Sequence, residues 1–153
     1  MQSKVVTKTE TLELSKLCKL AMVSGSFDLL HPGHLYLFKR AKELTPDAKL
    51  IVLVLDDANI KRRKGPERPI NLLKLRIEQL QKIKEVNYIL PWTEKWEETA
   101  EFVTALKPAY DIAVSGDPGI ENKQRIIETS GGRFITIPKL PGYSTTDLIK
   151  SLR

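Results

Sequence analysis

Residues 25–34 read GSFDLLHPGH and connect a predicted strand to a predicted helix. The preceding segment, Lys19–Ser24, is short and mostly apolar, which favours a buried strand. The following segment, Pro32–Leu44, has apolar residues at helical spacing, and proline is well tolerated in a first helical turn. Because free backbone N–H groups and the helix dipole converge at a helix start, this junction predicts an anion site.

Two histidines, His31 and His34, stand at this helix start, spaced so that both side chains can project from one face. They could be caps or satisfied polar groups, ligands of a metal ion, or donors that stabilise charge on a phosphate during displacement. A metal site would need a third ligand, and no HExxH-like pattern supplies one. Beside a predicted anion site, we favour the role of hydrogen-bond donor.

The turn before the histidines adds three candidate residues. The backbone N–H groups of Ser26 and Phe27 could face a reacting phosphate, while their side chains pack. Asp28 has two interpretations. It either holds the loop through local hydrogen bonds, which is common for an aspartate in a turn, or helps to organise Mg²⁺.

Length and composition limit the class of protein. The 153 residues fit one domain, 1–153, with a genuine core and an N-terminal extension, 1–18, that contains a short helix. No apolar run could span a bilayer and Met1–Leu14 is too polar for a signal peptide, so we expect a cytoplasmic protein without a membrane partner. The one cysteine, Cys18, excludes an internal disulfide and multi-cysteine metal sites.

Strand-like and helix-like segments alternate, which predicts an α/β fold, a Rossmann-like open parallel sheet of five strands with helices on both faces. The expected strands are Lys19–Ser24, Lys49–Leu55, Val86–Leu90, Asp111–Ser115 and Arg133–Pro138. The expected helices are Thr11–Leu17, Pro32–Leu44, Asn71–Lys84, Trp96–Leu106, Glu121–Thr129 and Thr145–Leu152. Polar residues follow the strand ends, and ligands of such sheets bind there, so we expect the site at that edge.

A basic cluster, residues 61–64 (KRRK), carries much of the formal net charge of +6. Because Gly65 and Pro66 follow it, we expect a loop. The cluster could be a solvated surface, an RNA or targeting patch, or a mobile arm that neutralises a polyphosphate. Beside the histidine loop, the last interpretation is favoured, and nucleic acid is not.

Further candidates lie late in the chain, at Asp117 and at the triplet Ser144, Thr145 and Thr146. The triplet precedes an apolar helical pattern and indicates an N-cap, and a capped helix start can also receive phosphates. Asp117 follows a predicted strand. It could contact a ribose or a base, or begin a turn with the proline and glycine after it.

Together these features resemble the cytidylyltransferase-like nucleotidyltransferases. Residues 25–34 match the GxFDxxHxGH loop of that family at every fixed position, and residues 144–146 match its STT helix start. Between them, residues 56–70 resemble the segment that covers the triphosphate, and the helix with Arg76 after it also fits. The resemblance covers nearly the whole chain in the right order.

The resemblance implies transfer of a nucleoside monophosphate from a nucleoside triphosphate to a small phosphorylated acceptor such as a sugar phosphate, releasing pyrophosphate. ATP is favoured and CTP is the alternative. Since the second pKa of a phosphate is about 6, the acceptor is already an anion at neutral pH and needs no general base. The implied catalytic residues are His31, His34 and Lys64. The implied nucleotide-binding residues are Ser26, Phe27, His31, His34, Arg62, Lys64, Asp117, Ser144, Thr145 and Thr146.

The resemblance also implies Mg²⁺ held by the substrate, no protein ligands to a metal, and a homodimer. Within the family, residues 57–71 favour the heptose 1-phosphate adenylyltransferase group, while Lys95–Glu98 favours the glycerol-3-phosphate cytidylyltransferases. A catalytically inactive module that binds a nucleotide or RNA is a further alternative. The chain departs from the family pattern at Ser115–Pro118, Lys139 and Tyr143, so the base and the acceptor stay open.

Overall fold

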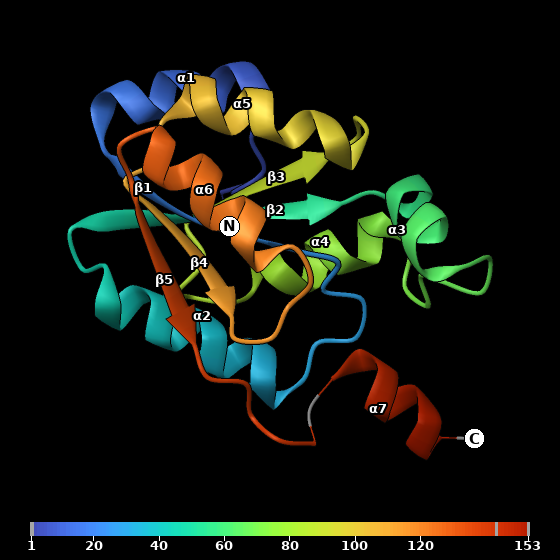
Figure 1. Ribbon diagram of the computed structural model, residues 1–153. Coiled ribbons are helices and arrows are strands. Elements are labelled where there is room, and N and C mark those ends of the chain that lie inside the picture. Colours follow the sequence, from blue (N-terminus) through green and yellow to red (C-terminus); the bar gives the residue numbers. More distant parts are fainter. Residues whose placement is uncertain (1, 143, 153) are drawn as a thin grey trace.

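Figure 1 presents a computed structural model of the chain, which describes residues 2–142 and 144–152. Within these ranges, five parallel strands form one sheet in the order β3-β2-β1-β4-β5. The strands are β1 (Lys19–Gly25), β2 (Ala48–Leu55), β3 (Tyr88–Trp92), β4 (Tyr110–Val114) and β5 (Arg133–Ile137). This confirms the predicted Rossmann-like α/β fold. From β1 the strand order runs through β2 to β3 on one side, and then returns to continue with β4 and β5 on the other side. Sheets of this kind bind ligands at such a reversal of the strand order, here between β1 and β4.

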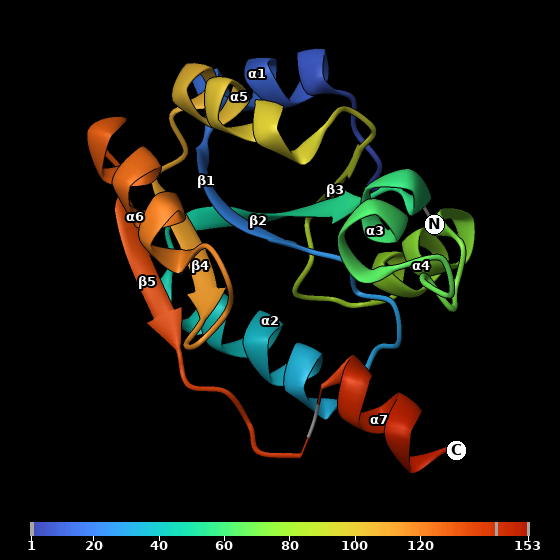
Figure 2. The ribbon, with the colours of Figure 1, turned by 45° about the vertical axis from the view of Figure 1, so that its right-hand side comes forward.

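The helices cover both faces of the sheet. Their bounds are α1 (Lys8–Leu17), α2 (Pro32–Leu44), α3 (Asp57–Lys64), α4 (Leu73–Gln81), α5 (Thr99–Leu106), α6 (Ile120–Thr129) and α7 (Thr145–Ser151), with a 3-10 turn, η1, at Trp96–Glu98. Figures 1 and 2 show α1, α5 and α6 over one face and α2 with α4 over the other. In both views α7 stands apart from the sheet, beside the beginning of α2.

Strand β2 explains why two cores form. Apart from the exposed Lys49 its residues are apolar, and from Leu50 to Leu55 all are buried. Alternate side chains point to opposite faces, so Leu50 and Val52 join the core under α2 and α4, while Ile51 and Leu53 join the core under α5 and α6. The sequence pattern predicted such a central strand, and the structure confirms it.

The basic cluster is a correction. We expected a loop at residues 61–64, but these residues form the last turn of α3. The Asp56 side chain caps the helix by accepting from the N–H of Asn59, and Gly65, at φ 103°, ends it. Cations near the end of a helix are stabilised by its dipole, which offsets the mutual repulsion of the four.

Other boundaries shift by a few residues. Strand β3 begins at Tyr88 rather than Val86, and α4 begins at Leu73 rather than Asn71. The segment expected as one helix from Trp96 opens as the 3-10 turn η1 before α5. The N-terminal helix starts earlier than expected, because Thr7 and Glu10 form a reciprocal capping box at its beginning.

The N-terminal segment lies along the outer edge of β3. Val5 forms a parallel bridge with Ile89, whose N–H donates to the Lys4 carbonyl and whose carbonyl accepts from the Val6 N–H, both at 2.9 Å. The helix that follows packs on the core under α5 through Leu12. In the part of the chain that the structure describes, no helix is long and apolar enough to cross a membrane.

Candidate active site

A pocket of about 290 Å³ opens at the carboxyl ends of β1, β4 and β5, beside the reversal point of the sheet. The sequence-predicted residues that line it are Ser26, Phe27, His31, His34, Lys64, Asp117, Ser144 and Thr146. Tyr36 and Lys123 also line it, and neither of them was assigned a site role from the sequence. Two more lining residues, Arg63 and Lys139, were noted in the sequence only as part of the basic cluster and as a departure from the family pattern. The pocket thus gathers side chains from both ends of the chain.

The two histidines hold each other in place through the backbone. Nδ1 of His31 accepts from the N–H of Gly33 at 3.1 Å, which makes His31 the N-cap of α2. Nδ1 of His34 accepts from the N–H of His31 at 3.3 Å. The rings stack with their centroids 3.8 Å apart. Since Nδ1 of each ring accepts, we infer that each neutral ring carries its proton on Nε2.

Burial keeps both rings neutral. It lowers the pKa of His34 to about 3, helped by the nearby charges of His31 and Lys64. Burial also lowers the pKa of His31, with a smaller effect from Lys139. At neutral pH the two imidazoles therefore serve as uncharged N–H donors, and not as acids that hold a proton to give away.

Phe27 supports the histidines from behind. Its ring packs edge-on against His34, with 5.2 Å between centroids, and also contacts Phe38. Its backbone lies in the left-handed region at φ 49°. A Cβ on Gly25 would come within 3.1 Å of the Phe27 ring, so glycine leaves room for this packing.

Asp28 does not face the pocket. It is completely buried, and its carboxylate accepts from the N–H groups of Ile70 and Asn71 at 2.8 and 2.7 Å, and from Nε of Arg68 at 3.1 Å. Both oxygens are thus engaged with a segment about forty residues away. Of the two interpretations of Asp28, the contacts favour the structural one, although the hydrogen bonds are long-range and not local.

Arg76, on α4, holds in place the segments that lie beneath the site. Its guanidinium is completely buried and donates to the carbonyls of Ser26 and Leu55 at 2.8 and 2.6 Å. It also donates to the carboxylate of Asp57 at 2.7 Å, the first residue of α3. One side chain therefore ties together the loop after β1, the end of β2 and the start of α3.

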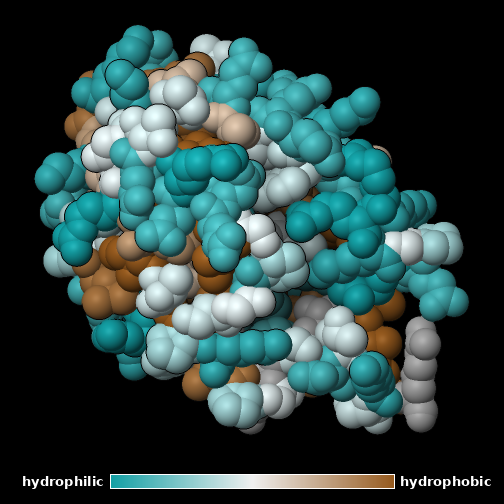
Figure 3. Space-filling model, viewed as in Figure 1, coloured by the Kyte–Doolittle hydropathy of each residue, from teal (hydrophilic) through white to brown (hydrophobic). Residues whose placement is uncertain are grey.

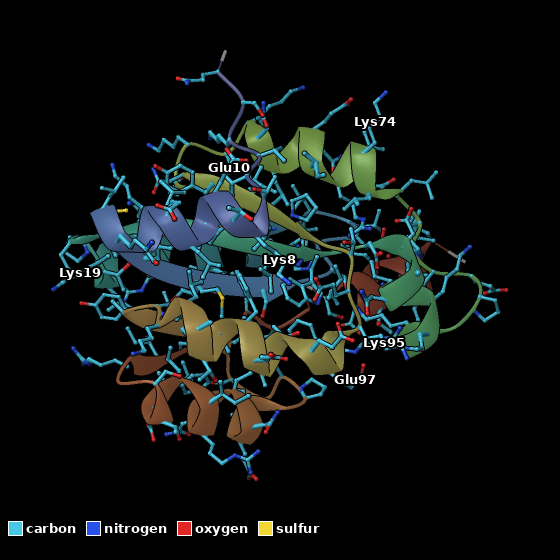
Figure 4. The ribbon with its side chains drawn as sticks, turned by 90° about the horizontal axis from the view of Figure 1, so that it is seen from above. Lys8, Glu10, Lys19, Lys74, Lys95 and Glu97 are labelled. Atoms are coloured by element: carbon cyan, nitrogen blue, oxygen red, sulfur yellow. The ribbon has the colours of Figure 1, made fainter. Side chains whose placement is uncertain are left out.

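The end of α3 supplies cations to the pocket, but not the pair that we expected. Arg63 and Lys64 line it, while Arg62 donates to Asn59 at 2.7 Å and pairs with Glu97 at 3.4 Å. Successive residues of a helix point about 100° apart, so neighbours face different surroundings. Figure 3 shows a hydrophilic surface over α3, and Figure 4 shows Glu97 beside that helix.

Partial burial and the neighbouring cations Arg68 and Arg63 lower the pKa of Lys64. Lys64 is also one of the charges that lower the pKa of His34, so the two side chains lie near each other. The structure thus brings this lysine and the histidines to one place, as expected.

The C-terminal segment closes the other side of the pocket. Ser144 is the N-cap of α7, its hydroxyl accepting from the N–H of Asp147 at 3.0 Å, which confirms the predicted cap. Thr145 begins that helix, but its side chain lies outside the described part of the structure, as does Tyr143. Within residues 2–142 and 144–152, no cluster of three or more His, Cys, Asp or Glu side chains could hold a metal ion.

Several known proteins resemble this chain in sequence. A family model described as cytidylyltransferase-like matches residues 22–151. The bifunctional protein HldE of Coxiella burnetii is 34% identical over 137 residues, which are 87% of this chain and 27% of the relative. HldE of Halorhodospira halophila is 35% identical over 88% of this chain and 28% of its own length. The chain thus spans less than a third of these curated relatives.

Two solved structures share the fold. A lipopolysaccharide core biosynthesis protein from Thermoplasma volcanium superposes with a TM-score of 0.67 at 24% identity, over 80% of this chain and 98% of that one. A pantoate-beta-alanine ligase from Francisella tularensis superposes with a TM-score of 0.68 at 15% identity, over 99% and 74%. At these identities the likeness concerns the fold alone.

Proposed function

Because the chain belongs to the cytidylyltransferase-like family of nucleotidyltransferases, we propose that its pocket transfers a nucleoside monophosphate from a nucleoside triphosphate to a small phosphorylated acceptor. The observation that carries this proposal is the convergence of two neutral imidazole donors with Arg63, Lys64 and Lys139 on one pocket. Neutral donors and fixed cations suit phosphate oxygens, and the pocket stands at the reversal point of the sheet.

The reaction needs placement and charge stabilisation more than acid–base chemistry. An oxygen of the acceptor phosphate attacks the α-phosphorus of the triphosphate and forms a new P–O–P bond. The bond between the α-phosphorus and its bridging oxygen breaks, and pyrophosphate leaves with the electron pair. No proton has to be removed from the acceptor, since its phosphate is an anion at neutral pH. His31 and His34 donate to the oxygens on which charge grows, and this requires their neutral, proton-bearing Nε2.

The cations of α3 act on the leaving group. Arg63 and Lys64 would hold the β- and γ-phosphates, and Thr146 with Ser144 would contact the nucleotide from the opposite wall. Mg²⁺, when bound to the triphosphate, would supply further charge neutralisation between its oxygens. The donor set of this pocket fits phosphate oxygens, so we propose that the substrate itself holds the ion.

We further propose ATP as the nucleotide and a sugar 1-phosphate as the acceptor. Support comes from residues 57–71, which resemble the heptose 1-phosphate adenylyltransferase group, and from the identity to the HldE proteins. CTP with glycerol 3-phosphate is the alternative, favoured by the segment Lys95–Glu98.

A pyrophosphate-release assay tests the proposal. ATP and CTP are each incubated with Mg²⁺ and a panel of aldose 1-phosphates, glycerol 3-phosphate and phosphocholine. We expect release that requires both a nucleotide and an acceptor and that is lost in His34→Asn. No release with any pair, together with no rise in melting temperature on adding either nucleotide, would overturn the proposed function.

A further inference from the structure

A second pocket of about 320 Å³ adjoins the nucleotide pocket. It lies between α5 and α6, on the sheet face away from α2, and we call it the Asp111 pocket. Ser24, Arg63, Pro118 and Lys123 line both pockets, so the two pockets adjoin along a common wall formed by these residues. A molecule in the Asp111 pocket could therefore reach the place where the α-phosphate would react.

Asp111 is the unusual residue of this pocket. It is only 3% exposed, yet its Oδ1 has no hydrogen-bond partner among the described residues. It stands on β4 beside Met22 of β1, among apolar side chains that include Val103 and Ile126. A buried carboxyl oxygen without a partner costs stability, which is typical of a group kept for a ligand. Burial raises the pKa of Asp111 to about 7, partly opposed by Lys123 and by a hydrogen bond from the backbone of Ile112.

The electrostatics limit what the pocket can bind. Trp96 forms part of its wall, and the Arg63 guanidinium and Lys123 ammonium lie 5.3 and 5.7 Å from its ring. The carboxylate of Glu97 also lines the pocket, but it pairs with Arg62. The two cations, at the wall shared with the nucleotide pocket, would therefore attract a phosphate and repel a positively charged head group. Deeper in, the Asp111 carboxyl, with a pKa of about 7, is partly protonated at neutral pH, so it can accept from a hydroxyl and, when protonated, also donate to one.

We propose that the Asp111 pocket binds the hydroxylated, uncharged body of the phosphorylated acceptor. Asp111 hydrogen-bonds a hydroxyl group of that body, and Lys123 holds the acceptor phosphate at the common wall, facing the α-phosphate. This inference rests on the proposed function and narrows it. It selects polyol and sugar phosphates over phosphocholine and phosphoethanolamine.

Two substitutions of one residue test the inference. Asp111→Leu removes the carboxyl but keeps the branched shape of the side chain, and Asp111→Asn keeps a donor and an acceptor. With the best acceptor of the panel, we expect Asp111→Leu to raise the KM for the acceptor about tenfold or more, the effect of one lost polar contact. The KM for the nucleotide should stay unchanged, and Asp111→Asn should recover most of the affinity for the acceptor.

Failure of this inference can be distinguished from failure of the proposed transfer reaction. Unfolding of Asp111→Leu checks the fold, and its melting temperature should equal or exceed that of the natural chain, because a buried carboxyl with one unpaired oxygen is gone. An unchanged KM for the acceptor in Asp111→Leu, or phosphocholine as the best acceptor, would overturn the inference while transfer itself stands. If no pair releases pyrophosphate, thermal shift decides: aldose 1-phosphates that stabilise the chain no more than methyl phosphate would overturn it.

Discussion

His31 serves α2 and the pocket with different ring nitrogens. Nδ1 caps the helix by accepting from the N–H of Gly33, so the ring cannot turn without breaking the cap. The cap thus determines both the tautomer, with the proton on Nε2, and the direction in which the Nε2–H bond points. A side chain oriented in this way loses little freedom when a phosphate arrives, which is the condition for strong electrostatic stabilisation of charge in the transition state.

Two variants of His31 separate these roles. His31→Ala removes both the cap and the donor, so we expect a free energy of unfolding lower by about 1 kcal/mol and a strongly reduced kcat. His31→Asn keeps a side chain that caps helices well but loses the imidazole donor. It should unfold like the natural chain, while kcat falls roughly 10²–10³-fold. Urea unfolding and pyrophosphate release measure the two effects, and a normal kcat in His31→Asn would contradict the donor role.

Individual site residues differed in how far the sequence could reveal them. His31, His34 and Ser144 were found because they stand at helix starts, where spacing and residue type are local signals. Asp111 appeared only inside an expected strand, since nothing local shows that a carboxylate will lack a partner. The hydrogen bonds of Asp28 join residues about forty positions apart, and no single-sequence pattern encodes such a pairing.

At the scale of the element, α3 is a helix that the periodicity of apolar residues did not predict. Only Asn59 and Ile60 of its residues are buried, so it presents no apolar stripe, and four cations followed by glycine indicated a loop. The helix start was nonetheless signalled by Asp56, a preferred N-cap residue. The consequence for the site is large, since a helix determines which of its neighbouring cations face the pocket.

This placement predicts an order among three substitutions. We expect Arg63→Gln and Lys64→Gln each to raise the KM for ATP about tenfold, because each removes a charged contact to the triphosphate. Arg62→Gln should have a clearly smaller effect, since its guanidinium is turned toward Asn59 and Glu97. Steady-state kinetics with varied ATP measure the three values. An equal rise in Arg62→Gln would contradict the assigned orientation of α3.

Arg76 connects the loop after β1, the end of β2 and the start of α3, so its replacement should lower the free energy of unfolding. Arg76→Met leaves the carbonyls of Ser26 and Leu55 and the Asp57 carboxylate without their donor. We expect the free energy of unfolding to fall by about 3–5 kcal/mol, as for other broken buried ion pairs. Asp57→Asn is the matched comparison. The side chain at position 57 is one-third exposed and an asparagine there keeps an oxygen acceptor, so the free energy of unfolding should fall much less than in Arg76→Met. Equal losses in denaturant unfolding would show that the ion pair, and not the carbonyl contacts, dominates.

At the scale of the whole molecule, the class of the sheet could be predicted from the sequence, whereas the order of its strands came only from the structure. The continuous apolar run of β2 requires burial on both faces, and alternation with helices then leads to a parallel sheet. The edge that holds the site followed from the same topology. The Asp111 pocket did not, because it arises where α5 and α6 diverge above the sheet, and helix separation is a property of packing.

Two buried groups give the molecule opposing pH responses. His34, with a pKa of about 3 against an ordinary 6.5, binds a proton more readily when unfolded, so it makes stability rise with pH between these values. Asp111, with a pKa of about 7 against 3.8, binds a proton more readily when folded, so it makes stability fall as pH rises through that interval. Between pH 4.5 and 6 the two contributions oppose each other.

Removing the Asp111 carboxyl should leave the contribution of His34 to the pH dependence of stability unopposed. Over pH 4.5–6, we expect the free energy of unfolding of Asp111→Leu, relative to the natural chain, to increase by about 1.4 kcal/mol per pH unit. Urea unfolding at several pH values measures this difference. Parallel pH profiles of the two proteins would mean that Asp111 titrates near its ordinary pKa in the folded state.

The short N-terminal segment beside β3 bears on self-association. Residues 4–6 occupy backbone groups of Ile89 that would otherwise face outward as a template for a strand of another molecule. A chain that begins at Thr7 should keep the pocket yet aggregate more at high concentration, which light scattering across a dilution series would register. Scattering equal to that of the natural chain would show that this edge needs no cover. We therefore expect the segment to limit the addition of further strands at this edge, a role in self-association that is separate from the chemistry of the pocket.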